Sequence, residues 1–216
     1  MCGRMAAVFS SDEAKAEFDI DIINKEFFPR YNLAPTQDIP VIVAGSRIFD
    51  VYKWGFIPHW AKDKSAGYRM INTKAETISE KRTFKEAFEK FRCIILTSGF
   101  YEWKNKKPFF FKLKKQKIFA FAGIATFWNN EKGEKIGTCS IITTEANKMV
   151  KKFHDRMPVI LDKKQIDDWI DIKNSDVEYL KTFLKPYDSG KMQYYKVSDK
   201  VNSVKNESPD LVKEID

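Results

Sequence analysis

The sequence predicts an α+β fold, in which a curled, barrel-like and mostly antiparallel β-sheet is flanked by helices. Three observations support this prediction. Apolar runs rich in β-branched and aromatic residues recur along the chain, short turn signals separate several of them, and segments with helical spacing lie between them. Neither an internal repeat nor a low-complexity linker interrupts the 216 residues, so we expect one domain over residues 1–216.

The expected strands contain many β-branched and aromatic residues, which pack well on a pleated sheet. They span residues 39–43, 47–54, 93–97, 108–113, 118–126 and 137–143. Turn-forming residues at 44–46, 104–107 and 129–133 leave only short connections, and short connections favour antiparallel neighbours. The sequence therefore predicts a sheet that contains several hairpins.

Five segments have the apolar spacing or the end signals of helices. They span residues 11–18, 83–91, 145–153, 163–169 and 175–184. Ser10 or Ser11 can cap the first segment. In the second, an apolar stripe recurs at intervals of three or four residues, so we expect this face to be buried in the core. The stripe comprises Phe84, Ala87, Phe88 and Phe91.

The composition, with 43% hydrophobic and 31% charged residues, is typical of a globular protein and not of a disordered chain. The net charge of +8 suits a polyanionic partner, but it suits equally a lysine-rich protein that binds no polyanion. Three widely spaced cysteines favour a reducing compartment over a disulfide framework, so we expect a cytoplasmic protein. No apolar stretch approaches the roughly 18 residues of a membrane span, and no leader-like segment opens the chain, so we expect neither membrane insertion nor export.

Six short islands combine polar, aromatic and Gly or Pro residues near the ends of the expected strands. They are MCGR at the start, RYNLAPTQ from Arg30, WGFIPHW from Trp54, INTKAET from Ile71, GFYEW from Gly99 and HDRMP from His154. Loops that a sheet holds in place are where functional sites are normally built. We therefore expect the chemistry of the protein in these islands.

Cys2 directly follows Met1, and its small size permits removal of that methionine. The processed chain would carry an α-amine and a thiol on adjacent carbons. An aldehyde would condense with the amine to an imine, and the thiol would then close a five-membered thiazolidine ring. The α-amine suits this chemistry, because its pKa of about 7.7 to 8.0 leaves more of it unprotonated than a lysine at about 10.4. The alternative is that Cys2 is buried and inert, as we expect for Cys93 and Cys139 within apolar strands.

Together the islands resemble the SRAP family, the SOS response-associated peptidase proteins that shield abasic sites in single-stranded DNA. The resemblance extends through VNSVKNESPDL at residues 201–211. It rests mainly on Cys2, the Asn and Glu of INTKAET, the Glu of FYEW, and HDRMP. It implies an SRAP fold and a role in the DNA damage response, in which Cys2 forms a thiazolidine crosslink with the ring-opened sugar of an abasic site.

The resemblance also implies roles for three other residues. Glu102 would transfer protons around the imine, His154 would handle the sugar oxygen as the ring opens, and Asn72 would hold the backbone or amine of Cys2. Such groups suit the reaction because both ring opening and loss of water need a proton. The alternatives are that Glu102 is a solvated side chain and that His154, like His59, is a hydrogen-bonded structural group.

The resemblance further implies a surface for single-stranded DNA, where cations track phosphates and aromatic rings stack on bases. The phosphate-contacting positions are Arg4, Lys74, Arg82 and Arg156. Trp60 would stack near the lesion, and Pro35 would pack against neighbouring bases. Relatives commonly have Arg where this chain has Lys74, and some have Trp where it has Ala61, so we expect a looser phosphate grip and less stacking. The lysines of NKKP and LKKQK are expected to be solvated.

Two other functions stay open from the sequence. The protein could be a thiol peptidase with Cys2 as nucleophile and Glu102 or His154 as base, whose activity could extend no further than its own first residue. It could also be a noncatalytic module that binds single-stranded DNA. Two His and three Cys without paired spacing do not match a zinc site, so we expect no metal and no cofactor. We expect a monomer whose partner is single-stranded DNA containing abasic sites, associated with the nucleoid if the source is bacterial.

Overall fold

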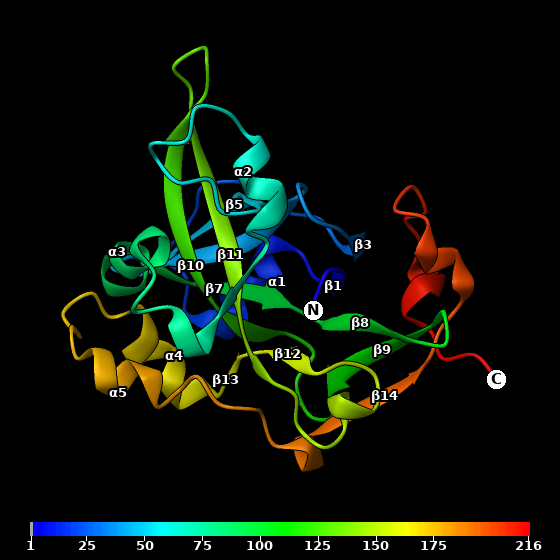
Figure 1. Cartoon of the computed structure of the whole chain (residues 1–216). Coiled ribbons are helices and arrows are strands. Elements are labelled where there is room, and N and C mark those ends of the chain that lie inside the picture. Colours follow the sequence, from blue (N-terminus) through cyan, green and yellow to red (C-terminus); the bar gives the residue numbers. More distant parts are fainter. Residues whose placement is uncertain (1) are drawn as a thin grey trace.

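The computed structural model describes residues 2–216 and has the predicted α+β architecture (Figure 1). Five strands form a closed barrel in the order β11-β10-β7-β4-β5, because β5 also pairs with β11. The barrel strands are β4 (Asp38–Val43), β5 (Ile48–Trp54), β7 (Arg92–Thr97), β10 (Phe119–Asn129) and β11 (Lys135–Glu145). Four of the five contacts around the barrel are antiparallel, and the β5–β11 closure is parallel. All five strands fall on runs that the sequence predicts as strands.

The barrel closes at a point where two backbones approach each other closely. Gly55 follows β5, and its N–H donates to the carbonyl of Cys139 on β11 over 2.8 Å. Its φ of 140° is one that L side chains rarely adopt, and a Cβ there would lie 2.6 Å from the carbonyl oxygen of Gly67. Only glycine fits such a position without strain.

A second sheet of five strands packs beside the barrel in the order β14-β9-β8-β1-β3. Its strands are β1 (Met5–Ala7), β3 (Arg30–Leu33), β8 (Gly99–Lys104), β9 (Lys107–Leu113) and β14 (Met192–Lys196). Phe100 of this sheet meets Phe121 of the barrel with ring centroids 6.0 Å apart, and the main hydrophobic core includes residues of both sheets. The two sheets therefore share one core.

Four shorter strands extend the barrel sheet at its margins. They are β2 (Ile22–Ile23), β6 (Asn72–Lys74), β12 (Arg156–Pro158) and β13 (Ile160–Leu161). β6 and β12 both pair with β11, near its carboxyl end, and meet it at Thr143. Segments some 80 residues apart in sequence, INTKAET and HDRMP, are thus attached to the same strand.

The helices lie around the sheets (Figure 1). They are α1 (Ser11–Phe18), α2 (Ser65–Arg69), α3 (Arg82–Lys90), α4 (Lys163–Ile170) and α5 (Val177–Lys181), with short 3₁₀ turns at Ala75–Thr77, Val150–Lys152, Ser189–Lys191, Asp199–Asn202 and Pro209–Val212. Ser10 caps α1 in a capping box with Glu13, as its position predicts. The stripe on α3 is buried except at Phe91, which is 40% exposed because the helix ends at Lys90.

The helix expected over residues 145–153 is wrong. β11 continues to Glu145, which pairs with Arg156, and only the 3₁₀ turn Val150–Lys152 forms. The side chain of Asn147 explains the difference, because its Oδ1 accepts the N–H groups of Met149 and Val150, each over 3.0 Å. An Asn that bonds the backbone in this way competes with helix formation. The helix expected over residues 175–184 is also shorter, with Asp176 as its cap.

Candidate active site

Cys2 lies just ahead of β1, an inner strand of the second sheet. Met5 is opposite Phe100 of β8, and the N–H of Tyr101 donates to the carbonyl of Arg4 over 3.0 Å. The chain ahead of β1 therefore runs antiparallel along β8, toward the end that carries Glu102. Cys2 is fully buried in the main core, whereas Met1 and its removal lie outside the described residues.

Asn72 reaches Cys2 from the barrel side. It begins β6, and its Nδ2 donates to the carbonyl oxygen of Cys2 over 2.7 Å. Its Oδ1 is buried and has no hydrogen-bond partner among residues 2–216. The amide thus fixes the main chain of Cys2 and keeps an acceptor beside it.

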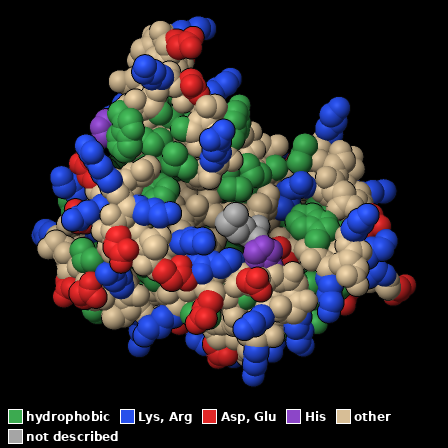
Figure 2. All heavy atoms as spheres, in the orientation of Figure 1, with side chains coloured by type: hydrophobic (Ala, Val, Ile, Leu, Met, Phe, Trp, Pro, Cys, Tyr) green, Lys and Arg blue, Asp and Glu red, His purple; other side chains and the backbone are tan. Residues whose placement is uncertain are grey.

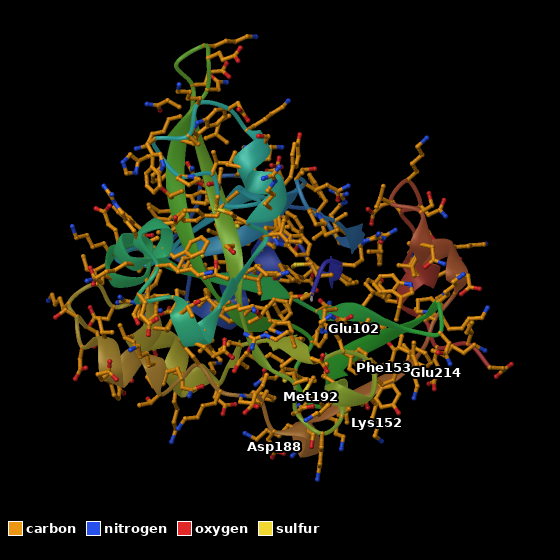
Figure 3. The ribbon with its side chains drawn as sticks, viewed as in Figure 1. Glu102, Lys152, Phe153, Asp188, Met192 and Glu214 are labelled. Atoms are coloured by element: carbon orange, nitrogen blue, oxygen red, sulfur yellow. The ribbon has the colours of Figure 1, made fainter. Side chains whose placement is uncertain are left out.

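Glu102 lies on β8, is only 5% exposed, and pairs across the sheet with Phe109 (Figure 3). Burial raises its pKa to about 7. The thiol of Cys2 is affected in turn, since burial and then the charge of Glu102 raise its pKa. Glu102 is therefore within electrostatic reach of Cys2 and near half-protonation at neutral pH, and its interpretation as a solvated side chain is wrong.

His154 lies between the 3₁₀ turn Val150–Lys152 and β12. The neighbouring ring of Phe153 packs against Phe109, the residue opposite Glu102, with ring centroids 4.9 Å apart, and Figure 3 shows it beside the sheet that carries Glu102. The Nδ1 of His154 accepts the N–H of Arg156 over 2.9 Å, and burial lowers the pKa of the imidazole. A neutral ring with Nδ1 as acceptor carries its proton on Nε2, so His154 can donate a hydrogen bond from Nε2.

Arg156 is fixed by contacts within the protein. Its guanidinium makes a two-pronged ion pair with Glu76, in which Nη2 lies 2.8 Å from Oε2, and Nη2 also donates to the carbonyl of Thr143 over 2.6 Å. The hydrogen bond from Arg156 lowers the pKa of Glu76. Glu76 was not among the predicted site residues, although it is the Glu of INTKAET. Its pairing orients the segment that holds His154.

Arg4 is also engaged inside the protein. Its Nη1 donates to Asn32 Oδ1 and to the carbonyl of Val201, each over 2.6 Å, and the guanidinium lies 5.8 Å from the ring centre of Trp103. Asn32 is a second residue that the predictions missed. It is fully buried within a strand, and an Asn there signals a polar partner, here the main chain of residues 201–206.

Of the other predicted DNA contacts, Lys74 borders this cluster, because it pairs with Thr143, whose carbonyl accepts Arg156, whereas Trp60 and Arg82 line a separate hollow. Trp60, 56% exposed and edge-on to the exposed His59, lines a hollow of about 420 Å³ together with Arg82 at the start of α3. Lys74 is exposed at the end of β6, and Pro35 is half-buried in the turn between β3 and β4. Figure 2 shows Lys and Arg side chains spread over the face in view, with Asp and Glu side chains among them.

The structure thus brings Cys2, Asn72 and Glu102 together, and His154, whose segment Arg156 orients, follows the ring that packs on the residue opposite Glu102. Cys93 and Cys139 are fully buried, as expected. Within residues 2–216, no group of three or more His, Cys, Asp or Glu side chains is arranged to hold a metal ion. Over the same residues, none of the helices is both long and apolar enough to cross a membrane.

Comparisons with known proteins match the sequence and the fold of this chain. The family model described as SOS response associated peptidase (SRAP) matches residues 1–204. Abasic site processing protein YoqW of Bacillus subtilis is 43% identical over 221 residues, covering 98% of this chain and 99% of its own. Abasic site processing protein YMR114C of Saccharomyces cerevisiae is 30% identical over 207 residues, which cover 90% of this chain and 55% of the yeast protein. A crystal structure of a protein from Bacteroides thetaiotaomicron has a TM-score of 0.89 at 28% identity. The match covers 99% of this chain and 100% of that protein chain.

Proposed function

Because the chain belongs to the SOS response associated peptidase family, we propose that it processes abasic sites in DNA, as the names of its relatives state of those proteins. In this proposal the processed chain captures the ring-opened sugar in single-stranded DNA and closes a thiazolidine through Cys2. The observation that carries it is the setting of Cys2, whose carbonyl bonds Asn72 over 2.7 Å and whose neighbour Glu102 has a pKa of about 7.

The proposed reaction begins with ring opening, in which the bond between the anomeric carbon and the ring oxygen breaks, the proton of the anomeric hydroxyl is transferred to the ring oxygen, and Nε2–H of His154 stabilises that oxygen through a hydrogen bond. The freed aldehyde is attacked by the α-amine of Cys2, and protonated Glu102 gives a proton to the departing hydroxyl, so that water leaves and an imine remains. The thiol then adds to the imine carbon. Its proton neutralises the developing nitrogen anion, directly or through Glu102, and the ring closes. A carboxyl group with a pKa near the working pH is suited to such two-way transfer.

The raised pKa of the Cys2 thiol bears on the peptidase alternative. A thiol peptidase attacks with a thiolate, which calls for a lowered thiol pKa. Burial and the charge of Glu102 act in the opposite direction here. The amine-first route needs no thiolate in its first step, and it is therefore the reaction that this environment favours. Peptidase activity limited to loss of Met1 stays a second candidate because of the family's description.

For the DNA surface, we propose that Lys74 and Arg82 contact phosphates, that Trp60 stacks on a base near the lesion, and that Pro35 packs against neighbouring bases. The exposure of Lys74, Arg82 and Trp60 supports these roles. The internal hydrogen bonds of Arg4 and Arg156 limit them to phosphates that approach their remaining N–H groups. The lysine at position 74 offers a single point charge, so a strand is held there less rigidly than by an arginine.

The proposal is tested with a uracil-containing single strand from which the base has been removed enzymatically. Wild-type protein should give a species that survives denaturation. Cys2→Ser keeps the terminal amine and should give only an imine, visible after borohydride reduction but lost without it. A glycine inserted before Cys2 keeps the thiol but moves the amine by one residue, and it should give no stable product.

Intact masses of all variants establish that Met1 has been removed, and Cys139→Ala serves as the control that retains the crosslink. A stable crosslink in the glycine-insertion variant would overturn the proposal. Salt-sensitive binding with no covalent product, equal for abasic and intact strands, would instead indicate the noncatalytic module.

A further inference from the structure

A second hollow, of about 390 Å³, lies over the β9–β10 connection and is lined by four lysines and an apolar floor. The lysines are Lys112, Lys114, Lys115 and Lys117. The floor includes Val8, Phe110, Leu113, Tyr195 and Val212. No acidic side chain is among the lining residues. This lysine hollow includes the LKKQK segment at residues 113–117, which takes no part in the proposed reaction at Cys2.

The lysine hollow and the site at Cys2 are on opposite faces of the second sheet. Phe100 and Phe111 face the main core, whereas Tyr101 and Phe110 belong to a smaller cluster with Val201 and Leu211 from the C-terminal segment. Side chains alternate between faces along a strand. Glu102 is therefore on the face of Phe100, and the floor residue Phe110 is on the other. A single-stranded DNA captured at Cys2 would therefore have to pass around the edge of the sheet to reach the lysine hollow.

Two of the four lysines bind another group of the protein through their ammonium groups, and the other two do not form an ion pair within residues 2–216. Lys117 pairs with Glu13, and Lys114 Nζ donates to the carbonyl of Gly190 over 2.8 Å. Lys112 and Lys115 have no ion-pair partner in the part of the chain that the structure describes. Their positive field over a concave apolar floor attracts a partner that is both anionic and apolar.

We propose that the lysine hollow docks an acidic protein segment that carries one bulky apolar side chain. The apolar side chain packs on the half-buried floor residues Val8, Tyr195 and Val212, and flanking carboxylates face Lys112 and Lys115. Nucleic acid fits less well, because bases stack on accessible ring faces. Phe110 is only 3% exposed, and its ring packs against that of Tyr101 with centroids 4.9 Å apart. The hydroxyl of Tyr195 donates to the carbonyl of Val212. The proposal does not depend on the reaction at Cys2.

The test uses the full chain and a short fluorescent peptide with one central Phe flanked on both sides by Asp residues. Fluorescence anisotropy should show saturable binding that weakens as salt is raised. Replacing the Phe with Ser, or every Asp with Asn, should each weaken binding by about tenfold, because one loses the apolar contact and the other the charges. Each peptide isolates one half of the proposed recognition.

The protein variant Lys112→Glu/Lys115→Glu should weaken binding of the Asp–Phe peptide by at least about tenfold. Its control is Lys164→Glu/Lys173→Glu, which makes the same change in net charge at exposed positions around α4 and should bind as the wild type does. Both variants should form the abasic-site crosslink at equal rates. Absence of peptide binding to wild-type protein, or equal loss in both variants, would overturn the proposal. Selective loss of oligonucleotide affinity in the first variant would also overturn it and assign the hollow to nucleic acid.

Discussion

Glu102→Gln should gain stability relative to wild type as the pH rises, while it disables the proposed reaction. Burial raises the pKa of Glu102 from about 4.5 to about 7, so the folded protein binds this proton more tightly than the unfolded chain does. Such a group stabilises the fold below its unfolded pKa, and that contribution is lost as the pH rises through the folded pKa. The shift corresponds to about 3 kcal/mol of unfolding free energy between about pH 4.5 and pH 7.

The assay is urea unfolding of wild type and Glu102→Gln over a pH series. Glutamine does not ionise, so the difference in unfolding free energy should move by about 3 kcal/mol in favour of the variant as the pH is raised from about 4 to about 8. Glu131→Gln, at an exposed carboxylate in the β10–β11 turn, is the matched control and should change the difference by less than about 0.5 kcal/mol. A pH-independent offset for Glu102→Gln would refute the argument from burial. The rate of crosslink formation should fall by about 10² or more, because a general acid is lost.

Two further substitutions test other parts of the structure. Asn72→Ala removes the 2.7 Å hydrogen bond to the Cys2 carbonyl and should slow single-turnover crosslink formation by about tenfold, with Asn24→Ala, the same change at an exposed position outside the site, as the control. Arg92→Met removes side-chain hydrogen bonds to five main-chain carbonyls in the core and should lower the unfolding free energy by about 3 to 5 kcal/mol in urea titrations, without changing the crosslinking rate of the folded protein. An unchanged crosslinking rate in the first, or unchanged stability in the second, would contradict these assignments.

Features that depend on local chemistry could be predicted from the sequence. The turn at 104–107 forms the β8–β9 hairpin, in which Asn105 and Lys106 adopt the left-handed φ values of 51° and 63° that a tight hairpin turn needs. The capping box on α1 follows from Ser10 and Glu13, three residues apart. The strands of the barrel were recognisable because β-branched and aromatic residues recur in them.

Features that depend on distant partners could not be predicted. β1 has only three residues, which is too short to show a periodic sequence pattern, and it forms by pairing with two strands further along the chain. The internal contacts of Arg4 require Val201, almost 200 residues away. The expected helix at residues 145–153 fails for the same reason. Asn147 also donates to the carbonyl of Tyr187 over 2.7 Å, and this tertiary contact outweighs the local preference for a helix.

The candidate site exists only where the two sheets meet. β1 and β8 of the second sheet supply Cys2 and Glu102, while Asn72 comes from the barrel. His154 follows a turn that is attached to barrel strand β11 through β12 and packs on β9 through Phe153. A small displacement of one sheet relative to the other would therefore separate Asn72 from the Cys2 carbonyl. The aromatic contacts between the sheets, such as Phe100 against Phe121, thus hold the reacting groups together as well as the core.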